Sequence, residues 1–432
     1  MSGIPICKRN SLLLRIGESL KSRKAEVLQA NAKDLEDATN SGIDASVYKR
    51  LLLDESKLSG LLDGLRELAE LGDPLGRVTL SRTLSQGLLL ERVTCPLGVL
   101  AIIFEARPEA VIQIASLALK SGNAVILKGG KEASRSNAAL VDVVRGAIAE
   151  EGGFPVDAVQ FVSTREDVAG LLALDEYIDL VIPRGSMKLV RDVKAATRIP
   201  VLGHADGICH VYLDSSVDGE AAAPVVVDSK TQYPAACNAA ETLLVHSGAI
   251  ASGAFMVVGR ALLKAGVTLH ADAVCLSALK ECAEPSKNEN QPIGTVILAQ
   301  QGDWDTEWLS LHMGVACVPS VEEAVAWINA HGSHHTDCIL TQEDSSAAFF
   351  MANVDSAGVY HNASTRFADG FRYGFGAEVG ISTNRLHARG PVGLEGLTTY
   401  KYTLRGEGHT VAQFSRGERA YAHYDHLDLA RK

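Results

Sequence analysis

The feature of this sequence that most constrains its fold is a series of short apolar segments separated by helical stretches. Val99–Phe104 (VLAIIF), Ala124–Lys128 (AVILK) and Val159–Val162 (VQFV) lack the alternation of apolar and polar residues that a half-exposed strand shows. Continuous apolar strands that alternate with helices are typical of a parallel, doubly wound α/β sheet. The same pattern predicts further strands at 179–183 and 199–202, with helices at 109–121, 134–150, 168–174 and 186–196.

The pattern restarts after Asp214 and predicts a second α/β domain. A helix from about Glu220 to Lys230 precedes a strand at Glu241–His246. Four later strand segments follow, with the sequences TVILA, GVACV, CILT and AGVYH. The fold class predicted from the residues is therefore α/β, with two doubly wound domains.

Two further regions flank the strand and helix series. Residues 9–69 have helical periodicity, with leucine stripes opposite charged faces. Residues 77–93 form a predicted hairpin with Gln86-Gly87 at its turn, and we expect residues 393–405 to form a closing strand that joins it. Such a ribbon often pairs with another subunit.

Composition narrows the classes of function. A formal net charge of −11 disfavours a general nucleic-acid or anionic-membrane surface. The eight cysteines are dispersed without a C-x-x-C pair, which favours reduced thiols over disulfides or a zinc ribbon. No apolar run approaches the ~20 residues of a membrane span, and the first ten residues lack a signal-peptide core. We therefore expect a soluble, cytoplasmic protein.

The loop Tyr233-Pro-Ala-Ala-Cys-Asn238 is the sharpest candidate for chemistry. Cys237 lies among small residues between a predicted helix and a buried strand, where a carbonyl compound could reach it. A cysteine is more often a small buried hydrophobic residue, and the local sequence alone leaves these two readings evenly balanced.

Two strand-to-helix turns are candidates for phosphate binding. Lys128-Gly129-Gly130-Lys131 follows one strand, and Pro183-Arg184-Gly185-Ser186 follows another. Glycines let a ligand approach the backbone, and a helix start favours an anion. Each could also be an ordinary turn with solvated side chains.

Two further loops offer donors for an anionic substrate. Glu105-Ala-Arg107 ends the first strand, and Asn362-Ala-Ser-Thr-Arg-Phe367 follows a later one. Arg107 could instead pair with Glu105 or Glu109. The histidine-rich stretches lack the carboxylate spacing of a metal site, so we expect no metal.

Several motifs together resemble the gamma-glutamyl phosphate reductases of the aldehyde-dehydrogenase superfamily. They are PLGVLAIIFEARPEAV, LKGGKEA, DLVIPRGS, VLGHADGICHVY, YPAACNAAETLLVH, NASTRF and the HARGP segment, and they span about residues 12–402. The family occurs alone or as the reductase half of delta-1-pyrroline-5-carboxylate synthase. The resemblance implies NADPH-dependent reduction of L-glutamyl 5-phosphate to L-glutamate 5-semialdehyde and phosphate, through a cysteine thioester, in proline biosynthesis.

The resemblance also implies roles for individual residues. Catalysis is assigned to Cys237 and Asn238. The proposed substrate contacts are Glu105, Arg107, Ser364, Thr365 and Arg366, and the cofactor contacts are Lys128, Gly129, Gly130, Lys131, Arg184, Gly185 and Ser186. Lys131 stands where NAD-using relatives often have an acidic residue, which favours NADPH. Gly203 falls about where oxidising relatives carry the glutamate that activates hydrolytic water.

The implied domains are an NADP-binding domain at 1–76 and 94–227, a catalytic domain at 228–375, and an oligomerisation ribbon at 77–93 and 393–410. We expect a homodimer or homotetramer with functional coupling to glutamate 5-kinase. Two alternatives stay open: another acylating semialdehyde dehydrogenase of the superfamily, and a non-catalytic NADPH-binding scaffold.

Overall fold

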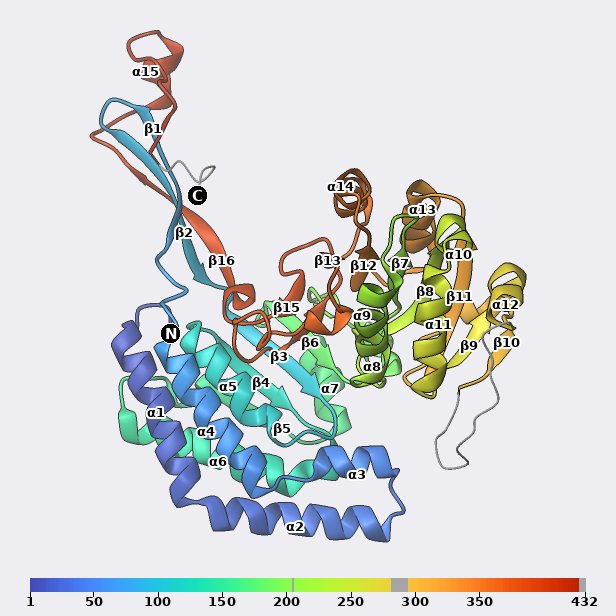
Figure 1. The fold of residues 1–432 in the computed structure, drawn as a ribbon. Coiled ribbons are helices and arrows are strands. Elements are labelled where there is room, and N and C mark those ends of the chain that lie inside the picture. Colours follow the sequence, from blue (N-terminus) through green and yellow to red (C-terminus); the bar gives the residue numbers. More distant parts are fainter. Residues whose placement is uncertain (204–205, 281–293, 427–432) are drawn as a thin grey trace. The chain divides into compact units, whose positions relative to one another are not determined.

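Two parallel sheets organise the chain, as the sequence predicted (Figure 1). The computed structural model describes residues 1–203, 206–280 and 294–426. The chain divides into two compact units, and each is described by itself. Unit 1 comprises Met1–Leu202, Phe375–Gly380 and the segment from Val392, and unit 2 comprises Gly203–Gly374 with Ile381–Pro391.

The division after Leu202 differs from the expected boundary at residue 227. The difference arises from a strand that the sequence reading missed, β7 (Cys209–Leu213). It pairs in parallel with β8 (Ala240–His246) and with β12 (Thr336–Leu340), so it belongs to the second sheet.

The sheet of unit 1 has the order β5-β4-β3-β6, with all neighbours parallel. Its strands are β3 (Val99–Phe104), β4 (Ala124–Lys128), β5 (Val159–Val162) and β6 (Leu180–Arg184). The prediction of a strand at 199–202 was wrong, because this segment makes only an isolated bridge from Val201 to Val181.

Helices lie on both faces of this sheet. The apolar side chains of α7 (Arg165–Leu172) and α8 (Met187–Ala196) pack with Ala101 and Val181. The chain adds β4 and β5 on one side of β3 and then crosses to add β6 on the other side. The connecting helices α5 and α6 therefore lie on the opposite face of the sheet. The N-terminal helices cover them (Figure 1). The bounds are α1 (Ile6–Ser22), α2 (Lys24–Asn40), α3 (Ala45–Leu51), α4 (Glu55–Glu70), α5 (Ala110–Lys120) and α6 (Ser134–Glu151).

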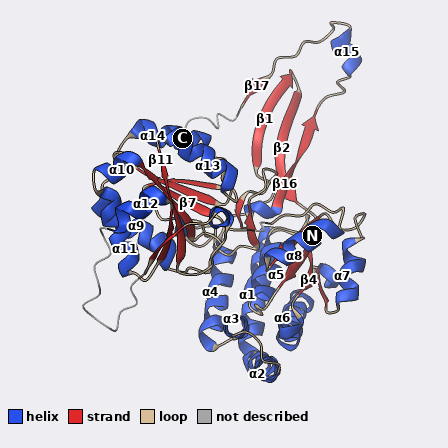
Figure 2. Cartoon of the chain, turned by 90° about the vertical axis from the view of Figure 1, so that its right-hand side faces the viewer, coloured by secondary structure: helices blue, strands red, loops and turns tan. Residues whose placement is uncertain are grey.

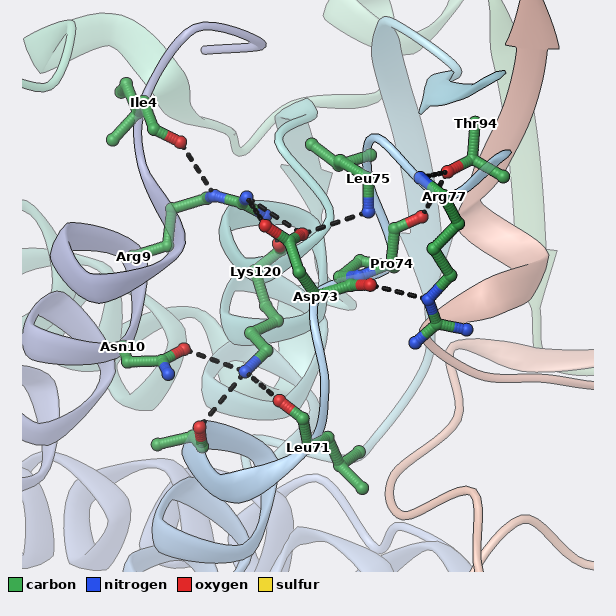
Figure 3. A network of polar contacts seen from close by, with 11 residues as sticks. Ile4, Arg9, Asn10, Leu71, Asp73, Pro74, Leu75, Arg77, Thr94 and Lys120 are labelled. Atoms are coloured by element: carbon green, nitrogen blue, oxygen red, sulfur yellow. Dashed lines mark hydrogen bonds and ion pairs between the residues drawn. The ribbon is translucent and has the colours of Figure 1, made fainter. Parts of the chain in front are cut away.

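The buried side chain of Lys120, at the end of α5, forms hydrogen bonds with α1 and with the end of α4 (Figure 3). The Nζ of Lys120 donates to Asn10 Oδ1 at 2.7 Å, to Ala69 O at 3.1 Å and to Leu71 O at 2.7 Å. Burial and the nearby charge of Arg9 lower the pKa of Lys120 to about 8. Arg9 in turn forms a 2.7 Å ion pair with Asp73, just before the ribbon begins. These bonds fix the place where the ribbon leaves the helices.

The ribbon is an antiparallel sheet of the order β16-β2-β1-β17. As predicted, the C-terminal strand β16 (Thr398–Arg405) joins the hairpin, and the structure shows that it pairs with the second hairpin strand. The hairpin strands are β1 (Val78–Ser85) and β2 (Leu88–Pro96), joined at Gly87, whose φ of 74° requires glycine-like freedom. The short strand β17 (Tyr424–Asp425) pairs with β1 and was not predicted.

Unit 2 contains a seven-stranded parallel sheet of the order β10-β9-β11-β8-β7-β12-β13. Helices cover both of its faces (Figure 2). One apolar cluster joins the sheet to α9, α11 and α12, and another joins its opposite face to α13 and α14. The remaining bounds are β9 (Thr268–Ala271), β10 (Val296–Leu298), β11 (His312–Val318), β13 (Gly358–His361), β14 (Gly380–Ser382), β15 (Gly390–Val392), α9 (Gly219–Thr231), α10 (Ser247–Ala251), α11 (Ala254–Lys264), α12 (Ala273–Lys280), α13 (Val321–His331), α14 (Asp344–Asn353) and α15 (Val411–Ser415).

Among the helices that the structure describes, none combines the length and the hydropathy that a membrane span requires.

Candidate functional site

The predicted nucleophile, Cys237, lies in unit 2 in the loop between α9 and β8. This loop is at the amino ends of β7 and β8, since Cys209 pairs with Ala240 at the start of both strands. Cys237 is half-buried. Within the described residues, neither its backbone N–H nor that of Asn238 donates a hydrogen bond. Two unpaired N–H groups beside a reachable sulfur can stabilise an oxyanion.

A second loop packs directly against the backbone of Cys237. A Cβ at Gly207 would lie 2.2 Å from Cys237 O and 2.5 Å from its Cα, so only glycine fits there. The buried Cys209 donates from its Sγ to Cys237 O at 3.3 Å. Gly207 itself is held by Glu307, whose Oε1 accepts from Gly207 N at 3.0 Å. These contacts fix the main chain at Cys237.

A buried ion pair joins the two ends of the Cys237 loop. Lys230 is at the end of α9 and Glu241 is at the start of β8, and both side chains are fully buried in contact with each other. Burial raises the pKa of Glu241 to about 7 and lowers that of Lys230, while their mutual attraction opposes both shifts. The other oxygen of Glu241 accepts from Leu309 N at 3.3 Å. The pair holds the ends of the loop together.

The predicted residues Asn238, Ser364, Thr365 and Arg366 lie together in unit 2. Asn238 donates from Nδ2 to Ala368 O at 2.8 Å, which ties the Cys237 loop to the loop after β13. Ser364 is also engaged, because its Oγ accepts from Arg366 N at 3.2 Å. The hydroxyl of Thr365 is enclosed without a partner among the described residues.

Arg366 is the predicted substrate residue with the most distinctive surroundings. Only 8% of its surface is exposed, and its Nε donates to Gln232 Oε1 at 2.9 Å. Burial is the main cause of a lowered pKa for its guanidinium, and the nearby charge of Arg372 adds to it. Cys237, Asp369 and Asp228 act on this pKa in the opposite direction.

The predicted cofactor residues lie in unit 1, at the carboxyl ends of β4 and β6. A Cβ at Gly129 would lie 2.1 Å from the amide nitrogen of the buried Asn137, whose side chain has no hydrogen bond in the described structure. Glu132 turns inward and accepts from Ala106 N at 2.8 Å, whereas Lys131 is exposed and forms no ion pair with any described residue. The turn thus offers close backbone approach, an unused buried amide and a cation.

The second turn already holds a carboxylate. Glu105 Oε2 accepts from Ser186 N at 2.9 Å at the start of α8, where Ser186 is the N-cap. A helix start that binds one acceptor oxygen suits a phosphate oxygen equally well. Glu105, predicted to contact substrate, therefore lies against the predicted cofactor residues Gly185 and Ser186. These residues, with the Gly129 turn, fit a dinucleotide.

The other two predicted residues of unit 1 differ in their surroundings. Arg184 donates from Nη1 to Glu378 O at 2.8 Å, and its own carbonyl accepts from Glu105 N. Arg107 forms no ion pair with Glu105, Glu109 or any other described residue, whereas Glu109 pairs with Lys57 at 3.5 Å.

Sequence reasoning missed Gly207, Lys230, Gln232, Glu241 and Arg372. The ion pair could have been predicted from the sequence. Lys230 ends a predicted helix and Glu241 begins a strand predicted to be buried, and a buried charge needs a partner. The approach of Gly207 to Cys237 joins residues 30 positions apart, and no local pattern reveals it. In the described part of the chain no three His, Cys, Asp or Glu side chains gather as a metal site would require.

Comparison with known proteins shows the family to which the sequence is similar. The model of the aldehyde dehydrogenase family matches residues 1–261. Gamma-glutamyl phosphate reductase of Synechococcus elongatus is 51% identical over 418 residues, which cover 96% of this chain and 93% of that protein. The enzyme of the same name from Trichormus variabilis is 52% identical, with 96% and 93% covered.

Solved structures show the same fold. The gamma-glutamyl phosphate reductase of Thermotoga maritima superposes with a TM-score of 0.88 at 38% identity, covering 95% of each chain. An NADP complex of glyceraldehyde-3-phosphate dehydrogenase from Methanocaldococcus jannaschii superposes with a TM-score of 0.64 at 14% identity, covering 94% of this chain and 91% of that one. At that identity the second match concerns the fold alone.

We predict that Lys230→Met destabilises the protein by about 3–5 kcal/mol, because it leaves the Glu241 carboxylate buried without its partner. Urea unfolding would measure the loss, with the exposed Lys264→Met as the matched control. The double variant Lys230→Met, Glu241→Leu should recover most of the stability, since two apolar side chains need no counter-charge. A single variant no less stable than the control would contradict the role of the pair.

Proposed function

We propose that this chain, which belongs to the gamma-glutamyl phosphate reductases of the aldehyde dehydrogenase family, reduces L-glutamyl 5-phosphate to L-glutamate 5-semialdehyde and phosphate. Membership makes it an oxidoreductase that uses a nicotinamide cofactor. The product lies on the route from glutamate to proline. The observation that carries the mechanism is the half-buried Cys237, held by Gly207 and the Lys230–Glu241 pair, with two unpaired backbone N–H groups beside it.

The first chemical step uses only residues of unit 2. The Cys237 thiolate attacks the acyl carbon, and the carbonyl oxygen takes the negative charge toward the N–H groups of Cys237 and Asn238. The carbon–oxygen bond to phosphate then breaks and a thioester remains on Cys237. The nicotinamide, when bound, supplies the hydride that this thioester requires. Collapse of the resulting thiohemiacetal releases the aldehyde and restores the thiolate.

Thioester hydrolysis would waste the acyl phosphate, so the site should lack a base that activates water. Gly203 occupies the approximate place of that base in oxidising relatives and has no side chain. The expected consequence is that inorganic phosphate, and not water, takes the acyl group in the reverse reaction.

We predict that Cys237→Ala abolishes the phosphate-dependent reduction of NADP⁺ by L-glutamate 5-semialdehyde, a loss of at least about 10³-fold, since no other group can carry the thioester. The reverse direction avoids the labile acyl phosphate. The exposed cysteine variant Cys7→Ala is the matched control and should keep wild-type activity.

Other outcomes identify other functions. Activity without phosphate would indicate a hydrolytic aldehyde dehydrogenase, and activity with coenzyme A in place of phosphate would indicate another acylating semialdehyde dehydrogenase. Wild-type protein that binds NADPH but turns over none of these substrates would indicate a scaffold. Activity that survives in Cys237→Ala would remove Cys237 from the reaction.

We infer NADPH as the cofactor from Lys131. This ammonium is exposed, follows the Gly129–Gly130 turn and has no ion pair in the described structure, so it can meet the 2′-phosphate that NADPH has and NADH lacks. Arg135, the next cation in the helix, is already paired with Asp37 and Asp34.

Lys131→Glu should therefore lower the ratio of kcat/KM for NADPH to that for NADH by about tenfold or more, by replacing attraction with repulsion at the 2′-phosphate. The same change at the exposed Lys33 of α2 controls for net charge. An unchanged cofactor ratio in Lys131→Glu would show that other residues select the cofactor.

We also propose that the ribbon joins copies of the chain into a homodimer or homotetramer. Tyr400, Tyr402 and Leu404 of β16 are each more than half exposed, which is costly for a face that stays in water. An assembly of this kind, in the cytoplasm and coupled to glutamate 5-kinase, would protect the acyl phosphate by shortening its path.

A further inference from the structure

Two arginines share one neutral partner beside the nucleophile loop. Arg366 donates from Nε to Gln232 Oε1 at 2.9 Å, and Arg372 approaches the same oxygen from Nη2 at 3.4 Å. Arg372 also donates from Nη1 to the backbone carbonyl of Arg366. Gln232 lies five residues before Cys237, so the two guanidinium groups meet at the loop that carries the sulfur.

This arrangement lacks a counter-charge. Neither arginine forms an ion pair within 4.0 Å of a carboxylate in the described part of the chain. The nearest acid in sequence, Asp369, instead accepts backbone N–H groups from Phe371 at 3.0 Å and from Arg372 at 3.2 Å. Asp228 and Asp369 act on Arg366 only electrostatically.

The unused donors belong to Arg366, a residue with only 8% of its surface exposed. Arg366 makes one side-chain hydrogen bond, through Nε, and its two Nη groups donate to no described residue. The Nη groups are not fully enclosed, so they reach solvent. Two adjacent cations, one of them largely desolvated, repel each other unless an anion lies between them. Such a cluster suits an anion of two charges.

We propose that Arg366 and Arg372, fixed by Gln232, bind the phosphate group of the acyl phosphate and hold it as it leaves. This inference rests on the proposed function and deepens it, by assigning the leaving group to a site.

The position of the cluster favours phosphate over the α-carboxylate of the substrate. In the acyl phosphate the phosphorus is one oxygen away from the carbon that Cys237 attacks, whereas the α-carboxylate is at the far end of the carbon chain. Arg366 bonds to Gln232 just before the Cys237 loop, and Asn238 ties that loop to the loop of Arg366 through Ala368. A dianion also matches two guanidinium groups better than a single carboxylate does.

The step balances without another reactant. After the sulfur–carbon bond has formed, the carbonyl re-forms, the bond from carbon to the phosphate oxygen breaks, and the electron pair of that bond goes to the phosphate oxygen. The two guanidinium groups stabilise the charge that the departing phosphate gains. In reverse, the same groups would position inorganic phosphate for attack on the thioester.

The test compares Arg372→Gln with wild type in the phosphate-dependent reduction of NADP⁺ by L-glutamate 5-semialdehyde. We expect the KM for phosphate to rise about tenfold or more, because a charged donor is lost, while the KM for semialdehyde changes less than about twofold. The KM for phosphate of Arg372→Lys should lie between those of the wild type and Arg372→Gln, since lysine keeps the charge but lacks the planar guanidinium. Arg260→Gln, on the surface of α11, makes the same charge change elsewhere in unit 2 and should leave both KM values unchanged.

A rise in the KM for semialdehyde with an unchanged KM for phosphate would overturn the proposal, because the cluster would then bind the α-carboxylate. Equal effects of Arg260→Gln and Arg372→Gln would also overturn it.

A second measurement does not depend on turnover. Inorganic phosphate should slow the alkylation of Cys237 by neutral iodoacetamide, followed by mass spectrometry of the Cys237 peptide. Arg372→Gln should need about ten times more phosphate for the same protection. If the wild type lacks reductase activity but phosphate still protects Cys237, the anion site stands and the proposed function fails. If the wild type is active but phosphate gives no protection, the anion site fails alone.

Discussion

The candidate site depends on the buried ion pair between Lys230 and Glu241. A loop of small residues has little packing of its own, and Cys237 would otherwise be free to move with it. The pair closes the ends of this loop, while Gly207 and Cys209 fix its middle against the start of the sheet. Removing two charges from water is costly, so a site that keeps such a pair gains geometric precision at the expense of stability. The sulfur and its two backbone N–H groups thereby keep one arrangement.

The site chemistry follows from which groups are already engaged. The Nδ2 group of Asn238, the Oγ of Ser364 and the carboxylate of Glu241 are bonded within the loops, so these groups position other residues. The N–H groups of Cys237 and Asn238 and the Nη groups of Arg366 have no partner among the described residues, which is why we propose them as the groups that bind substrate. In unit 1 the same reasoning separates Glu132, which is turned inward, from Lys131, which is not. These unpaired donors are the groups that the proposed site offers to a ligand.

The sequence predicted the parallel sheets well, because continuous apolar segments such as Val99–Phe104 are buried on both faces and carry a strong local signal. It did not predict β7, because this short strand follows a segment rich in glycine and histidine. It wrongly predicted a strand at residues 199–202. Motifs located the loops of Cys237, Arg366 and Ser186. Contacts between distant segments could not be predicted from the sequence, because they form only when the chain folds. Examples are the approach of Gly207 to Cys237 and the sharing of Gln232 by two arginines.

The claim that Cys237 carries the thioester is tested most simply by trapping the acyl group on this residue. Enzyme mixed with L-glutamate 5-semialdehyde and NADP⁺ in the absence of phosphate would be quenched rapidly in acid and its peptides analysed by mass spectrometry. A catalytic Cys237 should show a mass increase of one glutamyl group on its peptide, and this increase should be lost when inorganic phosphate is added before the quench. An unmodified Cys237, or a glutamyl group on another cysteine while NADPH forms, would contradict the central claim.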